Sequence, residues 1–241
     1  MKFWHVALLA VGMVLHLPLA EARAPASYDP LRLSERAPPA PVDVTVHDRD
    51  RDRDIPLRIY LPADDVAAPV VLFSHGLGGS REGSAFLGRH WAARGYVAVF
   101  LQHPGSDGDV WAGKSREQAM RALKRAANVQ NFVLRNEDVK AVLDQLDRWN
   151  RQPASRFVGR FDLAHVGMSG HSFGGVTTQA VSGQRYARGG QRFTDPRIAN
   201  PDLARRGGAL LAADVNALGV THDPSKPSHV TVIGHSYGST T

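Results

Sequence analysis

A glycine-flanked serine is the feature of this sequence with the clearest chemical use. Residues 170–174 have the sequence GHSFG, which matches the pattern G-x-S-x-G around Ser172. Where such a segment joins a strand to a helix, its tight turn presents the serine hydroxyl as a nucleophile for acyl transfer. Any loop rich in glycine and serine can match the pattern, so an ordinary turn is the alternative. The surroundings favour the nucleophile, because residues 163–169 predict a buried strand and residues 175–181 a short helix.

Two further loops carry residues suited to the same chemistry. Residues 75–80 (HGLGGS) and 102–107 (QHPGSD) each follow a continuous apolar run. Glycines in the first loop leave backbone N–H groups free to point at a developing oxyanion. The natural donors are the N–H groups of Leu77 and of Phe173, the residue after the serine. A plain tight turn is the alternative for this loop. His103 in the second loop has two candidate roles, which are lining the pocket and ordering its own loop.

The elements that must position these loops are predicted by the hydrophobic pattern. Strand-like runs occupy residues 42–47, 55–61, 69–74, 96–101 and 163–169, and helical patterns occupy residues 82–94, 115–134 and 138–150. The charged residues 48–54 between the first two strands predict a polar hairpin tip. Buried strands that alternate with helices predict an α/β fold with a doubly wound, mostly parallel sheet. The three loops then meet at the carboxyl ends of its strands.

The N-terminal segment predicts export. Residues 1–22 combine a basic Lys2, an apolar stretch and an A-x-A cleavage site, which is the pattern of a signal peptide. A membrane anchor is the alternative, but two histidines and a proline interrupt the stretch. The mature protein would begin at Arg23, lie in the periplasm or outside the cell, and have no membrane span. Residues 23–41 are rich in proline and alanine and predict an extended arm.

Composition narrows the possible functions. The 241 residues suffice for one α/β domain, and they include no cysteine, so an exported protein would have no disulfide framework. The net charge is +6, with the basic residues scattered. The densest cluster, within residues 116–125, has no interleaved aromatic residues and indicates a solvated helix face, so we expect no nucleic-acid partner. The acidic residues of 48–54 do not complete a calcium loop, and no metal or cofactor is expected.

Taken together, the motifs resemble a known family. Residues 73–81 (FSHGLGGSR), 102–107 and 170–175 (GHSFGG) are similar to predicted dienelactone hydrolases, the bacterial relatives of platelet-activating factor acetylhydrolase in the α/β-hydrolase superfamily. The resemblance extends over about residues 42–198. It implies an esterase, lipase or acetylhydrolase that cleaves a small-molecule or lipid ester through an acyl-enzyme on Ser172.

The resemblance does not continue through the tail. Residues 200–241 predict a helix, a loop and a strand that lead to a second G-x-S-x-G at residues 234–238, centred on Ser236. This tail resembles a different group of α/β-hydrolases, of unknown function. We therefore expect a hydrolase core over residues 42–199 that is truncated or fused after its elbow helix. Ser236 is the weaker candidate nucleophile, because no helical pattern follows it.

The other members of a catalytic triad are not evident. The superfamily order is serine, acid, histidine, and spacing alone permits Asp195 or Asp202 with His222. His222 precedes the strand predicted at residues 229–233, so it belongs at the amino end of that strand, roughly 17 Å from the carboxyl ends. The side chain of His171 is expected to point away from the adjacent Ser172. The alternative function is therefore a catalytically impaired hydrolase-like or fusion protein without a complete Ser-Asp-His triad, because a serine without a base is a weak nucleophile.

Overall fold

The computed structural model describes residues 36–184 and 193–198. Several predictions from the sequence lie outside the described residues. These are the signal peptide, most of the arm, and the tail with Asp202, His222 and Ser236.

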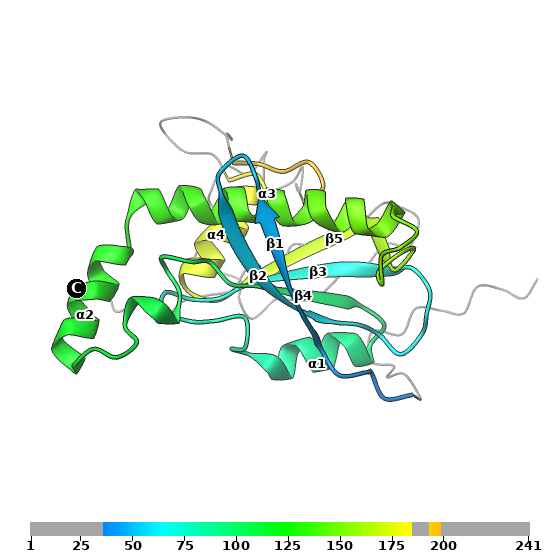
Figure 1. Cartoon of the computed structure of the whole chain (residues 1–241), viewed down its shortest axis with the longest axis horizontal. Coiled ribbons are helices and arrows are strands. Elements are labelled where there is room, and N and C mark those ends of the chain that lie inside the picture. The colour runs from blue at the N-terminus through cyan, green and yellow to red at the C-terminus, as the bar shows by residue number, and fades with distance from the viewer. Residues whose placement is uncertain (1–35, 185–192, 199–241) are drawn as a thin grey trace, which may run out of the picture. The chain divides into compact units, whose positions relative to one another are not determined.

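The described residues form an α/β unit in which each strand predicted between residues 42 and 169 is present (Figure 1). The elements are β1 (Val42–Asp48), β2 (Arg53–Tyr60), β3 (Ala68–Ser74), α1 (Ala85–Ala93), β4 (Val97–Leu101), the short 3₁₀ helix η1 (Gly108–Val110), α2 (Arg116–Ala126), α3 (Val129–Arg151), β5 (Phe161–Gly170) and α4 (Phe173–Val181). The β1–β2 pair is an antiparallel hairpin with the charged residues 49–52 at its tip, as the sequence predicts.

The sheet has the strand order β1-β2-β4-β3-β5. Strand β2 is antiparallel to both of its neighbours, whereas β3 is parallel to β4 and to β5. All strands except β2 therefore run in one direction, which confirms the predicted mostly parallel sheet for the described residues. The register pairs Ser74, the last residue of β3, with Leu101 of β4 and Gly170 of β5. The three loops singled out in the sequence consequently leave the sheet side by side.

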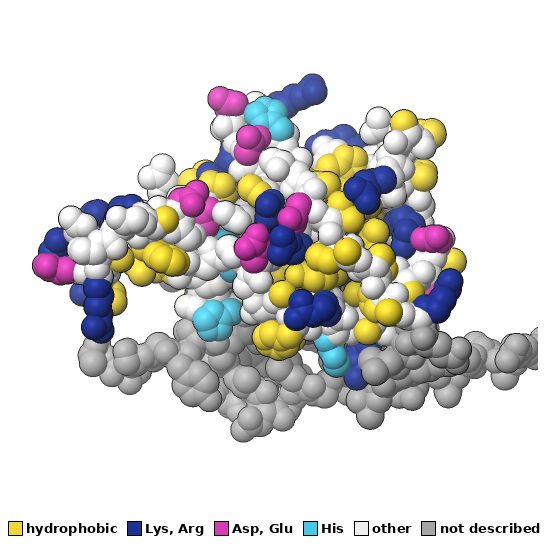
Figure 2. Space-filling view, turned by 60° about the horizontal axis from the view of Figure 1, so that its bottom comes forward, with side chains coloured by type: hydrophobic (Ala, Val, Ile, Leu, Met, Phe, Trp, Pro, Cys, Tyr) yellow, Lys and Arg dark blue, Asp and Glu magenta, His cyan; other side chains and the backbone are white. Residues whose placement is uncertain are grey.

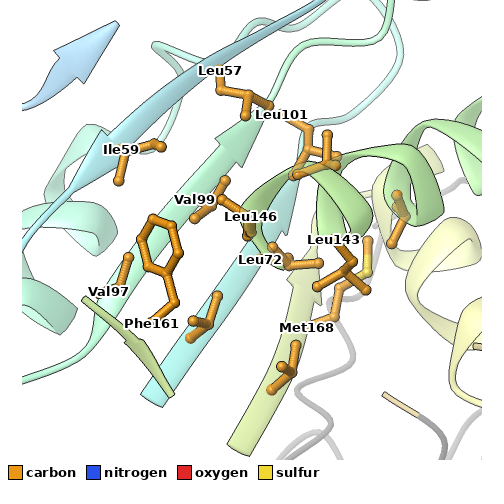
Figure 3. Close-up of a cluster of buried hydrophobic side chains, with 14 of the residues drawn as sticks. Leu57, Ile59, Leu72, Val97, Val99, Leu101, Leu143, Leu146, Phe161 and Met168 are labelled. Atoms are coloured by element: carbon orange, nitrogen blue, oxygen red, sulfur yellow. The ribbon is translucent and has the colours of Figure 1, made fainter. Parts of the chain in front are cut away.

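Helices cover both faces of this sheet, as a doubly wound fold requires. Helix α1 packs on one face, over an aromatic cluster in which the Phe73 and Phe100 rings stack with centroids 4.6 Å apart. Helices α3 and α4 pack on the other face, over the larger apolar core. Figure 3 shows Leu143 and Leu146 of α3 lying above buried side chains of the strands. Burial of these apolar groups is the main favourable term in holding the sheet and helices together.

One predicted boundary was wrong. The pattern indicated helices at residues 115–134 and 138–150, but the break falls at residues 127–128, and α3 runs on through the predicted gap. The reason is a local cap, because the side chain of Asn128 accepts a hydrogen bond from the Asn131 N–H at 2.8 Å and so starts a new helix. Helix α2 has its own start, a capping box between Ser115 and Gln118.

Charges on the face presented in Figure 2 are mixed rather than segregated. Figure 2 shows acidic and basic side chains interspersed over the face that it presents. The basic side chains of α2 are exposed to solvent, and Arg121 pairs with Glu117 one turn away. This is the solvated helix face that the sequence predicts. Within the described ranges, no helix combines the length and the apolar character needed to cross a membrane.

Candidate active site

Ser172 occupies a strained turn between a strand and a helix. Strand β5 ends at Gly170, helix α4 begins at Phe173, and Ser172 between them has φ 53° and ψ −116°. Positive φ is uncommon for a residue with a side chain, and such a conformation costs on the order of 1–3 kcal/mol. Strain of this kind persists only where the surrounding structure enforces it. The predicted strand, sharp turn and helix are thus all present around this serine.

Two glycines allow the turn to pack against β3. A Cβ atom built on Gly174 would lie 1.8 Å from the carbonyl oxygen of Ser74, and one built on Gly170 would lie 2.3 Å from the Gly174 carbonyl carbon. Both contacts are with backbone, which cannot move aside as a flexible side chain can. The turn is further fixed by the His171 N–H, which donates to the Ser74 carbonyl oxygen at 3.1 Å. The glycines of the motif therefore serve close approach of backbone to backbone.

The glycine-rich loop after β3 lies directly against Ser172. A Cβ atom built on Gly76 would be 3.3 Å from the Ser172 Cβ and 2.8 Å from the His171 Nδ1. The His171 ring, which we expected to point away, therefore lies beside Gly76 together with the serine. The sequence motifs that predicted an elbow and an oxyanion loop are in contact in the folded chain.

Hydrogen bonds fix the shape of this loop. The Gly78 N–H donates to the Ser106 carbonyl oxygen at 2.8 Å, and the Trp111 indole N–H donates to the Gly78 carbonyl oxygen, also at 2.8 Å. Across residues 36–184 and 193–198, no acceptor engages the N–H of Leu77 or of Phe173. The two groups predicted as oxyanion donors are therefore unpaired within the described part of the chain, beside the serine.

His75 ties the loop after β3 to the loop after β4. Its Nε2 accepts a hydrogen bond from the His103 backbone N–H at 3.1 Å, so its proton is on Nδ1, which donates to the Gly76 carbonyl oxygen at 2.7 Å. Burial and the neighbouring His103 together lower the pKa of His75 to about 2, and burial has the larger effect. A neutral His75 is the only form that satisfies both bonds.

Behind these loops, Ser74, His103 and Asp138 form a buried chain of hydrogen bonds. The Ser74 Oγ lies 2.9 Å from the His103 Nε2, and the His103 Nδ1 lies 3.0 Å from the Asp138 Oδ2. Burial and the nearby Arg135 charge lower the pKa of His103 to about 4, so the ring is neutral, donates to Asp138 and accepts from Ser74. All three residues have 0 % exposure, which keeps substrates away from them. The chain has the order of a catalytic triad, but its position gives it a structural role, and His103 orders its loop.

Arginines from the β1–β2 hairpin neutralise the Asp138 carboxylate. Arg53 donates to it from Nε at 2.7 Å and from Nη2 at 3.0 Å, and Arg51 donates from Nη1 at 3.0 Å. Burial alone would raise the pKa of Asp138, but hydrogen bonds from His103 and Arg53 outweigh burial and lower the pKa to about 2. The carboxylate is therefore ionised and connects the hairpin to the site.

The charged members of this cluster were not predicted, although the sequence holds a signal for them. The buried face of α3 repeats every three or four residues along the helix. Toward the N-terminal end of α3, this buried face includes Arg135 and Asp138. Charged residues on an apolar stripe need partners, so these two positions mark a buried polar cluster. Which partners they find depends on the tertiary fold and cannot be deduced from spacing.

The structure places Asp195 at the far end of α4. Its backbone N–H donates to the Val181 carbonyl oxygen at 2.9 Å, whereas Ser172 precedes the first residue of that helix. The Asp195 carboxylate is buried and accepts two hydrogen bonds from the Arg197 guanidinium, at 2.9 and 2.6 Å. A nine-residue helix spans about 13 Å, so Asp195 lies well away from the serine. Within the described residues no histidine is hydrogen-bonded to the Ser172 hydroxyl.

Comparison with known proteins gives short or partial similarities. No protein-family model matches the sequence. Two uncharacterized proteins of Mycobacterium tuberculosis, from strains CDC 1551 / Oshkosh and ATCC 25618 / H37Rv, are each 69% identical over 49 residues, which is 20% of this chain. The chain spans 7% of the length of these relatives.

Among solved structures, the chain is similar to a ferulic acid esterase from Streptomyces cinnamoneus, with 21% identity over 61% of this chain and 56% of that one and a TM-score of 0.47. It is also similar to a puromycin-hydrolyzing peptidase of Mycobacterium tuberculosis (21% identity, 60% and 20% of the two chains, TM-score 0.42) and to an acylaminoacyl peptidase of Pyrococcus horikoshii (20% identity, 60% and 21%, TM-score 0.38). The strand order, the two-sided helix packing and the serine elbow give the described residues of this chain an α/β-hydrolase fold.

Proposed function

We propose that this protein is a serine hydrolase of carboxylic esters, of esterase, lipase or acetylhydrolase type. The observation that carries the proposal is the strained elbow at Ser172 packed against a loop with an unpaired N–H. In the proposed reaction the Ser172 Oγ attacks the ester carbonyl carbon. The carbonyl oxygen becomes an oxyanion held by the Leu77 and Phe173 N–H groups. Return of the carbonyl expels the alcohol, and water hydrolyses the resulting acyl-enzyme.

The choice of an ester rests on the sequence. Residues 73–81, 102–107 and 170–175 resemble the predicted dienelactone hydrolases related to platelet-activating factor acetylhydrolase, and that resemblance supports an ester substrate, either a small molecule or a lipid. The attack also requires a base for the serine proton. His222 with Asp202 as its acid remains a candidate from sequence spacing, whereas Asp195 pairs with Arg197 at the far end of α4 from Ser172.

A second candidate function is a hydrolase-like protein with impaired turnover. It is favoured by one observation, that no histidine is hydrogen-bonded to the Ser172 hydroxyl within the described residues. An enzyme without its base retains only about 10³–10⁴-fold catalysis over water, from its oxyanion hole and substrate binding. The two candidates therefore differ in rate, while both keep the same nucleophile.

Labelling with a fluorophosphonate probe tests the proposal. We expect the probe to modify the protein and Ser172→Ala to abolish the modification, while Ser236→Ala leaves it intact. Labelling that persists in Ser172→Ala but is lost in Ser236→Ala would show that the nucleophile is Ser236 of the second motif. Hydrolysis of p-nitrophenyl acetate then separates the two candidates, because only a complete triad supports turnover far above that of a base-free variant.

We further propose that the protein is exported after cleavage before Arg23, on the strength of the sequence pattern in residues 1–22. N-terminal sequencing of protein from the periplasm or medium should give Arg23 or a nearby residue. An intact Met1 on protein that only detergent extracts would instead support a membrane anchor.

A further inference from the structure

Arg135 is a completely buried cation at the centre of the candidate site. It lies on α3 with 0 % exposure, and its guanidinium donates to the Thr177 Oγ1 at 3.2 Å, the Ser106 Oγ at 2.8 Å and the Ser74 Oγ at 3.0 Å. It also donates to the carbonyl oxygen of His75. These acceptors come from α4, from the end of β3 and the loop that follows it, and from the loop that follows β4. One planar group thus joins the end of β3 and its following loop, the loop after β4, and helix α4.

The three hydroxyl acceptors are oriented by a second hydrogen bond each. The Thr177 hydroxyl donates to the Phe173 carbonyl oxygen at 3.1 Å, and the Ser106 hydroxyl donates to the His103 carbonyl oxygen at 3.2 Å. The Ser74 hydroxyl donates to the neutral His103 ring. Each hydroxyl passes on its only proton and turns its lone pairs toward Arg135, which fixes the guanidinium in one position.

Both proposed oxyanion donors are connected to this guanidinium through neighbouring backbone or side-chain groups. On one side, Arg135 holds the carbonyl of His75, two residues before Leu77. On the other side, it holds Thr177, which holds the carbonyl of Phe173, and its charge also lies 4.7 Å from the centre of the Phe173 ring. One rigid fork is therefore bonded, directly at His75 and through Thr177 at Phe173, to the backbone next to each of the two N–H groups.

The cost of this arrangement is high. Taking a guanidinium wholly out of water is expensive, and replacing a complete buried ion pair by well-packed apolar side chains is often neutral or stabilising. Burial lowers the pKa of Arg135 to about 9, which reflects that cost. An apolar side chain could fill a purely structural role at a lower free-energy cost of burial. Positioning two peptide groups, in contrast, needs directional hydrogen-bond donors.

We propose that Arg135 is a positioning residue of the oxyanion hole, which holds the Leu77 and Phe173 N–H groups at the separation that a developing oxyanion requires. The proposal deepens the proposed function and rests on it. Misplacement of such donors lowers the rate of attack without removing the nucleophile.

The test compares two matched variants of α4. Thr177→Val and Thr178→Val each remove one buried hydroxyl that bonds back to a carbonyl four residues earlier, but only Thr177 also accepts from Arg135. Two quantities are measured, the rate constant for labelling of Ser172 by a fluorophosphonate and the NMR order parameters of the Leu77 and Phe173 amides. Arg135→Lys, which keeps the charge and loses the fork, is the direct variant if it folds.

We expect Thr177→Val and Arg135→Lys to slow labelling about tenfold or more, since loss of a whole donor costs about 10²–10³-fold. Thr178→Val should stay within about twofold. We also expect Thr177→Val to lower the order of Leu77, with which Thr177 shares no hydrogen bond among the described residues, as well as that of Phe173. Equal rates in both threonine variants, or a change at Phe173 without one at Leu77, would overturn the proposal.

The two proposals can fail separately. If the wild-type protein is not labelled at all, the proposed function fails, and the order parameters alone decide the role of Arg135. Coupled loosening of Leu77 and Phe173 in Thr177→Val but not in Thr178→Val would then still support positioning. Normal labelling with no difference between the variants would reject only the role of Arg135.

Discussion

At the scale of single residues, the site depends on backbone groups that approach without side chains between them. Gly174 lies so close to the Ser74 carbonyl oxygen that even a methyl group has no room. The sequence predicted a tight turn at this position, but only the folded sheet shows what the glycine faces.

Gly174→Ala should therefore destabilise the protein by about 1–3 kcal/mol or more, the usual cost of overpacking. The matched control is Gly108→Ala, where the nearest atom to a built Cβ is an ordinary contact at 3.8 Å and the change should be within about 0.5 kcal/mol. Urea unfolding gives the free energy of unfolding of both variants. Equal stability of the two variants would show that the elbow is not packed on β3 as described.

The buried histidines predict a loss of stability in weak acid. The pKa of His75 is lowered from 6.5 to about 2 and that of His103 from 6.5 to about 4, so below pH 6.5 the unfolded chain binds protons that the folded chain does not. The stability contributed by these rings is thus complete above pH 6.5 and is lost as the pH falls, down to about 4 for His103 and about 2 for His75. Between pH 6.5 and 4 the slope of the unfolding free energy against pH approaches that of two protons. Asp138 extends the loss below its ordinary value of 3.8, because its pKa is lowered to about 2.

Urea unfolding at several pH values between 7 and 4.5 gives this slope directly. His75→Gln can keep neutral hydrogen bonds. It should reduce the slope of the unfolding free energy against pH from about two protons to about one, even if it lowers stability overall. A slope that is flat in the wild type, or unchanged in His75→Gln, would contradict the neutral buried rings.

At the scale of elements, the strands and the site loops were predictable because each has a local signature. Continuous apolar runs marked β3 and β4, and glycines marked the loops that follow β3 and β5. The break between α2 and α3 was not predicted, since the periodic pattern is compatible with one helix across it and the deciding cap at Asn128 is a single side-chain bond. The cluster around Arg135 and Asp138 was not predicted either, because its partners come from segments distant in sequence.

Asn128→Ala should cost about 1 kcal/mol, within the range of about 0.5–2 kcal/mol for a lost N-cap. Asn128→Asp keeps the acceptor for the Asn131 N–H but loses the hydrogen bond that the Asn128 amide donates to the Arg125 carbonyl oxygen at 2.8 Å, so it should recover only part of the lost stability. Chemical unfolding followed by circular dichroism compares the two. If both variants were equally stable, the cap would not be what starts α3.

At the scale of the whole molecule, the described residues combine a mostly parallel sheet with a serine elbow and an adjoining glycine-rich loop. The sheet brings these motifs together because β3, β4 and β5 are parallel and end at one edge. The resemblance at residues 73–81 and 170–175 thus has a structural counterpart, in that Gly76 lies beside Ser172. The triad acid and base lack such a counterpart, since Asp195 pairs with Arg197 and His222 lies outside the described residues.

The central claim is that Ser172 forms an acyl-enzyme, and trapping that intermediate tests it most directly. The protein is mixed with p-nitrophenyl acetate, quenched in acid, digested and analysed by mass spectrometry for acetylated peptides. We predict an acetyl group on Ser172, formed in step with the first released p-nitrophenol, and no acetylated peptide from this segment in Ser172→Ala. An acetyl group on Ser236, or stoichiometric p-nitrophenol release that Ser172→Ala leaves unchanged, would contradict the account.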